Sequence, residues 1–196
     1  MEQGILSEEE EKKDAIHKTI EEAKRMNQIL QDMLELSALE SGKIGKEEIV
    51  EIEELMNSVF SRYKMRIDEK ELQIETSFSS FSIQIVRKEG ESLLANLLEN
   101  AIKYTPSKGK ITLELIKEKR MFRVIDTGIG IAKENQERVF ERFFQVDRSH
   151  SKKVEGTGLG LAIVKHICLL YQIQISLSST LGKGTSIELV FNENMQ

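Results

Sequence analysis

The residues best suited to chemistry lie in three short segments that are far apart along the chain. The first is 96–104, with the sequence NLLENAIKY, in which Asn96, Asn100 and Lys103 are separated by four and three residues. A helix would place these three side chains on one face. A carboxamide oxygen is a neutral hard donor that suits Mg²⁺ on nucleotide phosphates, so we expect Asn100 to be a metal ligand. Lys103 would then place an ammonium beside the phosphates, and Tyr104 a ring near the base or ribose.

The second segment, 126–131, has the sequence DTGIGI and follows a run that alternates like a strand. Gly128 and Gly130 permit sharp turns and a close approach of backbone to a ligand, and Ile131 ends the segment. A carboxylate only accepts hydrogen bonds, so Asp126 matches the exocyclic amine of adenine and would repel the carbonyl oxygen of guanine. The pattern alone also fits an ordinary acidic turn. Because this pattern lies between the other two segments, we interpret it as part of a nucleotide site. Asp126 then predicts binding of ATP in preference to GTP.

The third segment consists of Gly156, Thr157, Gly158, Leu159 and Gly160 and leads into a predicted helix. A glycine-lined helix start presents backbone N–H groups and the positive end of the helix dipole to an anion, so we expect phosphates there. A flexible loop before a helix would explain the glycines but not the hydroxyl of Thr157 among them. The spacing matches neither a P-loop nor a dinucleotide-binding fingerprint.

Residues 132–155 are expected to form a mobile lid that contains a short helix. Arg138 and Arg142 lie one helical turn apart in this polar, lysine-bearing segment. Lids over active sites bury little when empty and are ordered by their ligand. We expect Arg142 to contact phosphate, and Phe140 and Phe143 to pack the lid against the body.

A long helix is predicted over 7–41, because this stretch lacks Gly and Pro and carries apolar residues at alternating spacings of four and three. Ser7 suits the helix start and Gly42 its end. The heptad seam comprises Ile16, Ile20, Ala23, Asn27, Leu30 and Leu34, and it is widened by Met26, Ile29, Met33 and Leu36. This width favours packing in a bundle of four helices, with a solitary cap on the domain as the alternative.

We divide the chain into a helical segment 1–42, a linker with a first strand 43–52, and a domain 53–196 in which strands and helices mix without βαβ regularity. The domain is predicted to contain helices at 52–67, 90–104 and 159–171, and strands at 72–78, 81–87, 110–116, 121–126, 173–178 and 185–191. The strands 110–116 and 121–126 are expected to be neighbours.

In this order the three segments, with RVFERFFQVD at 138–147 and LELSALESG at 34–42, resemble the sensor histidine kinases of two-component systems, which belong to the GHKL ATPase superfamily. The resemblance implies an α+β fold, a Bergerat-type ATP-binding sandwich of a mixed β-sheet and α-helices, preceded by one long amphipathic helix. It implies ATP and Mg²⁺ as cofactors and residues 1–42 as the second helix of a dimerisation hairpin. The implied reaction donates the γ-phosphoryl group of ATP to a histidine, for relay to a response regulator.

The phosphoacceptor histidine of that family is followed by an acidic residue, and no such pair occurs here. His17, His150 and His166 precede Lys, Ser and Ile, respectively. None is expected to accept phosphate, and we interpret the chain as a truncated piece without the first hairpin helix. The expected partners are a histidine-bearing first helix, the receiver domain of a response regulator and, in the intact protein, a second copy as a homodimer. A nucleotide-binding interaction module and another GHKL-type ATPase remain as alternatives.

Composition narrows the class of protein further. The net charge of −5 gives no broad basic field, so no nucleic acid partner is expected. Cys168 lies among apolar neighbours and is expected to be a buried small hydrophobe. No apolar stretch approaches the roughly 20 residues needed to cross a bilayer. This chain is expected in the cytoplasm, whereas the resemblance implies that the intact protein is anchored in the cell membrane.

Overall fold

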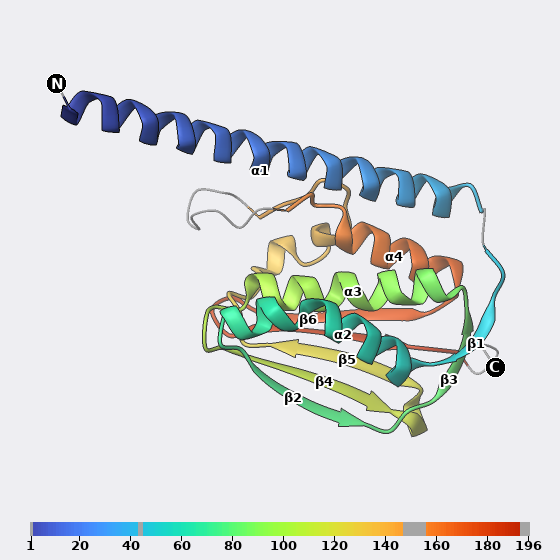
Figure 1. Ribbon diagram of the computed structural model, residues 1–196. Helices are drawn as coiled ribbons and strands as arrows, with labels where there is room; N and C mark the ends of the chain where they lie inside the picture. The colour runs from blue at the N-terminus through green and yellow to red at the C-terminus, as the bar shows by residue number, and fades with distance from the viewer. Residues whose placement is uncertain (1, 43–44, 147–155, 193–196) are drawn as a thin grey trace.

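A five-stranded mixed sheet in the order β2-β4-β5-β7-β6 carries three helices on one face (Figure 1). In this computed structural model the described residues are 2–42, 45–146 and 156–192. Strands β2 and β4 run parallel, and the other neighbouring pairs are antiparallel. The strands are β2 Gln73–Phe78, β4 Lys110–Ile116, β5 Met121–Asp126, β6 Gln174–Thr180 and β7 Gly184–Val190. The predicted α+β sandwich is confirmed, as is the pairing of 110–116 with 121–126.

The helices over the sheet are α2 Ile52–Glu69, α3 Arg87–Tyr104 and α4 Gly160–Leu170. A separate antiparallel pair, β1 Glu48–Glu51 and β3 Ser82–Ile85, lies at one end of the helical layer (Figure 1). Three short 3-10 helices also occur among the described residues: η1 Lys117–Lys119, η2 Lys133–Asn135 and η3 Arg138–Phe140. Each predicted strand and helix is present, with ends shifted by a few residues.

The core forms where the alternating strands meet the leucine-rich helices. On β4, Ile111, Leu113 and Leu115 are buried, whereas the residues between them are only partly covered. Since successive side chains of a strand point to opposite faces, this pattern gives the sheet one face toward the helices. The burial of apolar area on that face, at about 25 cal/mol per Å², is the main stabilisation of the sandwich.

Helix α3 lies at the centre of this layer and is held at both ends. Near its start, Gly90 allows the helix to approach the side chains of Leu55 and Ile85, which a Cβ at Gly90 would meet at 2.9 and 3.3 Å. At its end, the ammonium of Lys70 donates hydrogen bonds to the backbone oxygens of Ile102 and Thr105, both at 2.6 Å. It also donates to the backbone oxygen of Lys103 at 3.2 Å. These contacts satisfy carbonyls that a helix end otherwise leaves unpaired.

The long helix α1, Glu2–Glu40, lies along α4 on the side away from the sheet (Figure 1). It begins upstream of Ser7, so the predicted start at Ser7 was wrong, because the single Gly4 before it does not stop a helix. Its end was predicted correctly, since Gly42 adopts φ +65° just beyond it. No helix within the described ranges is both long enough and apolar enough to span a membrane.

Only part of the apolar surface of α1 is covered by the domain. Leu36 and Leu39 are buried, with exposed fractions of 4% and 5%. The predicted seam instead faces outward, with Ile16, Leu30 and Leu34 exposed at 59%, 56% and 63%. The helix therefore packs on the domain through one stripe and presents a second apolar stripe that needs a partner to leave water.

We predict that Lys70→Met destabilises the fold by about 1 to 3 kcal/mol, because it leaves the carbonyls at the end of α3 without their donor. Urea denaturation of the substituted and parent chains measures this difference. Lys64→Met, at an exposed position of α2, is the matched control and should change the free energy of unfolding little. An equal effect of both substitutions would show that Lys70 does not hold the end of α3.

Candidate functional site

The polar face of α3 forms one wall of the candidate site. Asn96, Asn100, Lys103 and Tyr104 are all partly exposed, whereas the leucines between them are buried. The side-chain amide of Asn96 donates to the backbone oxygen of Ser92 at 2.9 Å, which fixes its orientation. The side chain of Asn100 makes no hydrogen bond within the described part of the chain, so its carboxamide oxygen is available to a ligand.

The third glycine segment lies directly against this face. A Cβ on Gly160 would come 2.6 Å from Oδ1 of Asn96, and one on Gly156 would collide with Nζ of Lys103. The ammonium of Lys103 also lies 5.0 Å from the centre of the Tyr104 ring, within range of a cation–π interaction. Glycine is required here because any side chain would fill the space between the loop and the polar face of α3.

Asp126 lies at the end of β5 with its carboxylate held by two backbone groups. Its Oδ1 accepts hydrogen bonds from the N–H groups of Gly128 at 2.8 Å and Thr185 at 3.3 Å. Burial raises the pKa of Asp126 above its ordinary value of 3.8, and these two contacts oppose the rise. Both contacts use Oδ1, so Oδ2 is left to accept a hydrogen bond from a ligand.

The second glycine segment is close to the backbone on both of its sides. A Cβ on Gly128 would come 2.6 Å from the backbone oxygen of Tyr104, at the end of α3. Gly130 has φ +66°, and its Cβ would collide with the backbone oxygen of Thr180. Ile131 donates its N–H to Oγ of Ser179 at 2.8 Å. The segment therefore joins the end of α3 to the turn between β6 and β7.

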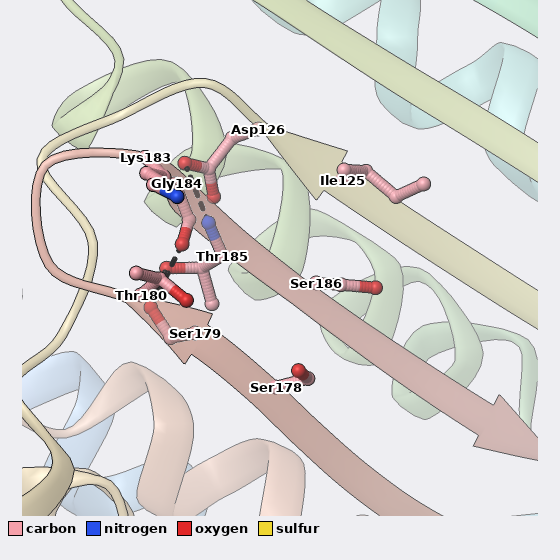
Figure 2. Close-up of a pocket in the computed structure, with 9 residues that line it drawn as sticks. All are labelled: Ile125, Asp126, Ser178, Ser179, Thr180, Lys183, Gly184, Thr185 and Ser186. Atoms are coloured by element: carbon pink, nitrogen blue, oxygen red, sulfur yellow. Dashed lines mark hydrogen bonds between the residues drawn. The ribbon is translucent and has the colours of Figure 1, made fainter.

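A hollow beside Asp126 opens at this turn (Figure 2). It is lined by Ile125, Asp126, Ser178, Ser179, Thr180, Lys183, Gly184, Thr185 and Ser186. Of these residues only Asp126 was predicted as part of the site. The missed residue that contacts its carboxylate is Thr185, which pairs with Asp126 across β5 and β7. The sequence Lys183-Gly184-Thr185 was its only signal, and it became informative once the strand register was known.

The lid is described from Ala132 to Val146 and is tied to the third glycine segment. Phe143 has φ +61°, which is uncommon for a residue with a side chain, and donates its N–H to the backbone oxygen of Gly158 at 2.9 Å. The predicted short helix is present as η3. Arg142 pairs through Nη2 with Glu40, in the last turn of α1. Its predicted phosphate contact therefore stays a prediction.

Thr157 also contacts α1. Its hydroxyl donates to Oδ2 of Asp32 at 2.6 Å, and its oxygen accepts the N–H of Leu159 at 3.2 Å. Leu159 precedes the first residue of α4, and no side chain within the described ranges caps that helix end. The first N–H groups of α4 therefore have no side-chain cap among the described residues, and the phosphate site predicted at this helix end stays a prediction.

The remaining titratable residues do not gather into a second site. His17 is exposed on α1, 3.5 Å from Glu21, and His166 lies on α4. His150 lies outside the described residues, as do Lys152 and Lys153. No cluster of three His, Cys, Asp or Glu side chains suited to a metal occurs among the residues that the structure describes. Burial raises the pKa of Cys168 to about 12, so this thiol is unreactive.

Comparison with known proteins places this arrangement among nucleotide-binding domains. Residues 86–195 match the family described as histidine kinase-, DNA gyrase B-, and HSP90-like ATPase. The sensor-like histidine kinase SenX3 of Mycolicibacterium smegmatis is 35% identical over 90% of this chain and 47% of its own length. The histidine protein kinase SaeS of Staphylococcus aureus is 31% identical over 97% of this chain and 56% of its own length.

The chain therefore spans about half the length of these curated relatives. Among solved structures, full-length ShkA in complex with AMPPNP superposes with a TM-score of 0.69 and 26% identity. That match covers 84% of this chain and 36% of ShkA.

We predict that Asp126→Asn stabilises the nucleotide-free chain near neutral pH. Because the pKa of Asp126 is raised in the folded state, its favourable contribution is complete below the unfolded pKa near 3.8 and is lost as pH rises through the folded pKa. The substitution removes this loss, while the carboxamide oxygen can still accept both N–H groups. Urea denaturation should show a gain near neutral pH that shrinks as the pH is lowered toward about 4.

Asp68→Asn, at an exposed position of α2, makes the same change of charge and is the control for this measurement. Its free energy of unfolding should follow the parent at each pH. A destabilised Asp126→Asn chain near neutral pH would contradict the assignment of Asp126 as a carboxylate that is unfavourably buried.

Proposed function

The chain belongs to the family of histidine kinase-, DNA gyrase B- and HSP90-like ATPases, and we propose that it is the ATP-binding catalytic core of a sensor histidine kinase. Helix α1, in residues 1–42, is then the second helix of a dimerisation hairpin, residues 43–52 are the linker and first strand, and residues 53–196 are the catalytic domain. The two curated relatives reported above are both named as histidine kinases.

One observation supports this proposal most strongly: the polar face of α3 meets both glycine segments. Gly156 and Gly160 lie against Lys103 and Asn96, and Gly128 lies against the backbone of Tyr104. Between them lie the carboxylate of Asp126, suited to the adenine amine, and the open helix end of α4, suited to phosphate. ATP is the ligand class that requires both chemistries, and ShkA has been solved with the nucleotide analogue AMPPNP.

Mg²⁺ is the proposed metal, and Asn100 is its proposed ligand. The carboxamide oxygen of Asn100 has no hydrogen-bond partner among the described residues and lies one turn from Lys103. When bound, Mg²⁺ would neutralise negative charge on the nucleotide phosphates. Lys103 supplies a second positive charge on the same face of α3. We propose that Gly130, Ile131 and Leu159 belong to the ATP site through their backbone.

The proposed reaction transfers the γ-phosphoryl group of ATP to an imidazole nitrogen. A P–N bond forms, the bond between the γ-phosphorus and the bridging oxygen breaks, and ADP leaves with the electron pair. The imidazole gives up its N–H proton to the acidic residue that follows the histidine on the partner helix. This chain contributes positioning and charge: Thr157 and the amides of α4 at the phosphates, and Arg142 from the lid. The acceptor imidazole is proposed to come from a partner helix, for relay to a response regulator receiver domain.

The ATPase alternative needs a carboxylate that activates water, and the acid beside Asn100 is engaged elsewhere. Glu99 accepts hydrogen bonds from Tyr63 at 3.3 Å and from Arg66 at 3.0 Å, both on α2. It therefore braces α2 against α3, as its position off the polar face predicts. The outward seam of α1 favours an interaction module. The hairpin of a dimeric kinase anchored to the membrane requires the same seam, so it does not distinguish the two functions.

We predict that Asn100→Ala lowers the magnesium-dependent part of ATP affinity by about tenfold, because it removes the metal ligand. Calorimetry with ATP in the presence of Mg²⁺ or of EDTA separates this part from base recognition. The parent should also bind ATP more tightly than GTP. Asn57→Ala, at an exposed position of α2, is the control. An unchanged magnesium dependence in Asn100→Ala would contradict the assignment of Asn100 as the metal ligand. Equal affinities of the parent for ATP and GTP would contradict the assignment of Asp126 to adenine recognition.

We predict that the chain alone acquires no acid-labile phosphate from radiolabelled ATP, but phosphorylates a supplied helix in trans. The peptide should carry the histidine-acid pair of the kinase family and pack on the seam through Ile16, Ile20, Leu30 and Leu34. A peptide with Gln in place of the histidine is the control. Label on His17, His150 or His166 without the peptide would contradict the proposal, and a bound but unlabelled peptide would favour the interaction module.

A further inference from the structure

We infer that helix α1 restrains the nucleotide site, because Asp32 and Glu40 hold the two side chains, Thr157 and Arg142, that are proposed to contact phosphate. Docking of α1 on the lid and binding of ATP then compete for the same groups. This inference rests on the proposed function and adds a mode of regulation to that site.

The contact at Asp32 occupies the only proton of the Thr157 hydroxyl. A threonine hydroxyl can donate one hydrogen bond, and here it donates to Oδ2 of Asp32 at 2.6 Å. The other carboxylate oxygen accepts from Nε2 of Gln28 at 2.7 Å, so the acid is oriented from within α1. Thr157 cannot donate to a phosphate oxygen until this hydrogen bond breaks.

The contact at Glu40 engages Arg142, the lid side chain that is proposed to contact phosphate. The guanidinium of Arg142 pairs with this carboxylate, with side chains exposed at 54% and 36%. The next residue, Phe143, is joined to Gly158 by a backbone hydrogen bond of 2.9 Å. The hydrogen bond from Phe143 to Gly158 therefore links the loop segment that carries Arg142 to the one that carries Thr157. Helix α1 contacts both side chains.

The negative charge of Asp32 and Glu40 also opposes the binding of nucleotide. A carboxylate beside Thr157 would lie next to the phosphates that the open end of α4 is proposed to bind, and like charges at such distances repel. The docked position of α1 therefore combines two lost ligand contacts with an unfavourable field for ATP. Both contacts are partly exposed and individually weak, so a modest binding free energy can break them.

The docked position is otherwise favourable, because Leu36 and Leu39 are buried between α1 and the domain. These two leucines lie between the two acids along α1, with Asp32 one turn before Leu36 and Glu40 directly after Leu39. Release of the two acids does not require the helix to unfold, only to shift on its apolar contact. By linkage, whatever displaces α1 raises nucleotide affinity, and nucleotide loosens α1 by the same factor.

The decisive experiment compares two double variants of the whole chain by calorimetry with ATP and Mg²⁺. Asp32→Ala/Glu40→Ala removes both acids that contact the site. Glu10→Ala/Asp14→Ala removes one Glu and one Asp from exposed positions on the same helix, so its composition and net charge are identical. We expect about fivefold tighter ATP binding in the first variant and parent affinity in the second.

Amide hydrogen exchange over residues 29–40 provides the reciprocal measurement. Addition of ATP should speed exchange there in the parent and in the control variant, because docking is weakened, and should have little effect in Asp32→Ala/Glu40→Ala.

The outcomes separate this inference from the proposed function. Parent binding that equals that of Asp32→Ala/Glu40→Ala, or slower exchange over 29–40 with ATP, overturns the restraint and leaves the ATP site intact. An equal gain in ATP affinity in both double variants would show that only net charge matters, and it would also overturn the restraint. Binding by Asp32→Ala/Glu40→Ala alone supports the restraint strongly. Binding by none of the chains refutes the nucleotide site itself, and the restraint with it.

Discussion

The packing of α3 is the constraint on which the site depends. Its leucine face is buried against the sheet and its neighbours, and its C-terminal carbonyls are fixed by Lys70. Because the apolar face can point in only one direction, the core determines which way the face with Asn96, Asn100 and Lys103 points. On this face the side chain of Asn100 makes no hydrogen bond among the described residues, so its carboxamide is available to a ligand.

Asp126 illustrates the opposite arrangement, in which a functional group destabilises the folded chain. Its carboxylate is buried, and the two N–H contacts from Gly128 and Thr185 offset only part of the desolvation. The glycines around it exist because the backbone of α3 and the turn at Thr180 approach too closely for side chains. The site therefore concentrates tight packing and an unfavourable charge where a base would bind, whereas the phosphate side is open and polar.

The sequence predicted the elements well because their signals are local. The alternation of β4, the leucine spacing of α3 and the glycine after α1 each reflect the preference of one segment for one conformation. Contacts between α1 and the site could not be predicted, because Asp32 and Thr157 are separated by 125 positions and meet only through packing of whole helices. Thr185 was missed for the same reason, since its role depends on the register between β5 and β7.

Helix α1 carries two apolar stripes, and this links the two halves of the molecule. The stripe with Leu36 and Leu39 is buried on the domain, and the stripe with Leu30 and Leu34 faces water. A partner on the outer stripe gains burial without touching the nucleotide site, yet it fixes the position of a rigid helix that also bears Asp32 and Glu40. A small difference in how well the two positions of α1 suit that partner would shift the population in which Thr157 and Arg142 are released. Weak, exposed acid contacts suit this purpose better than strong ones, because a strong restraint would need more differential binding energy than one helical stripe can supply.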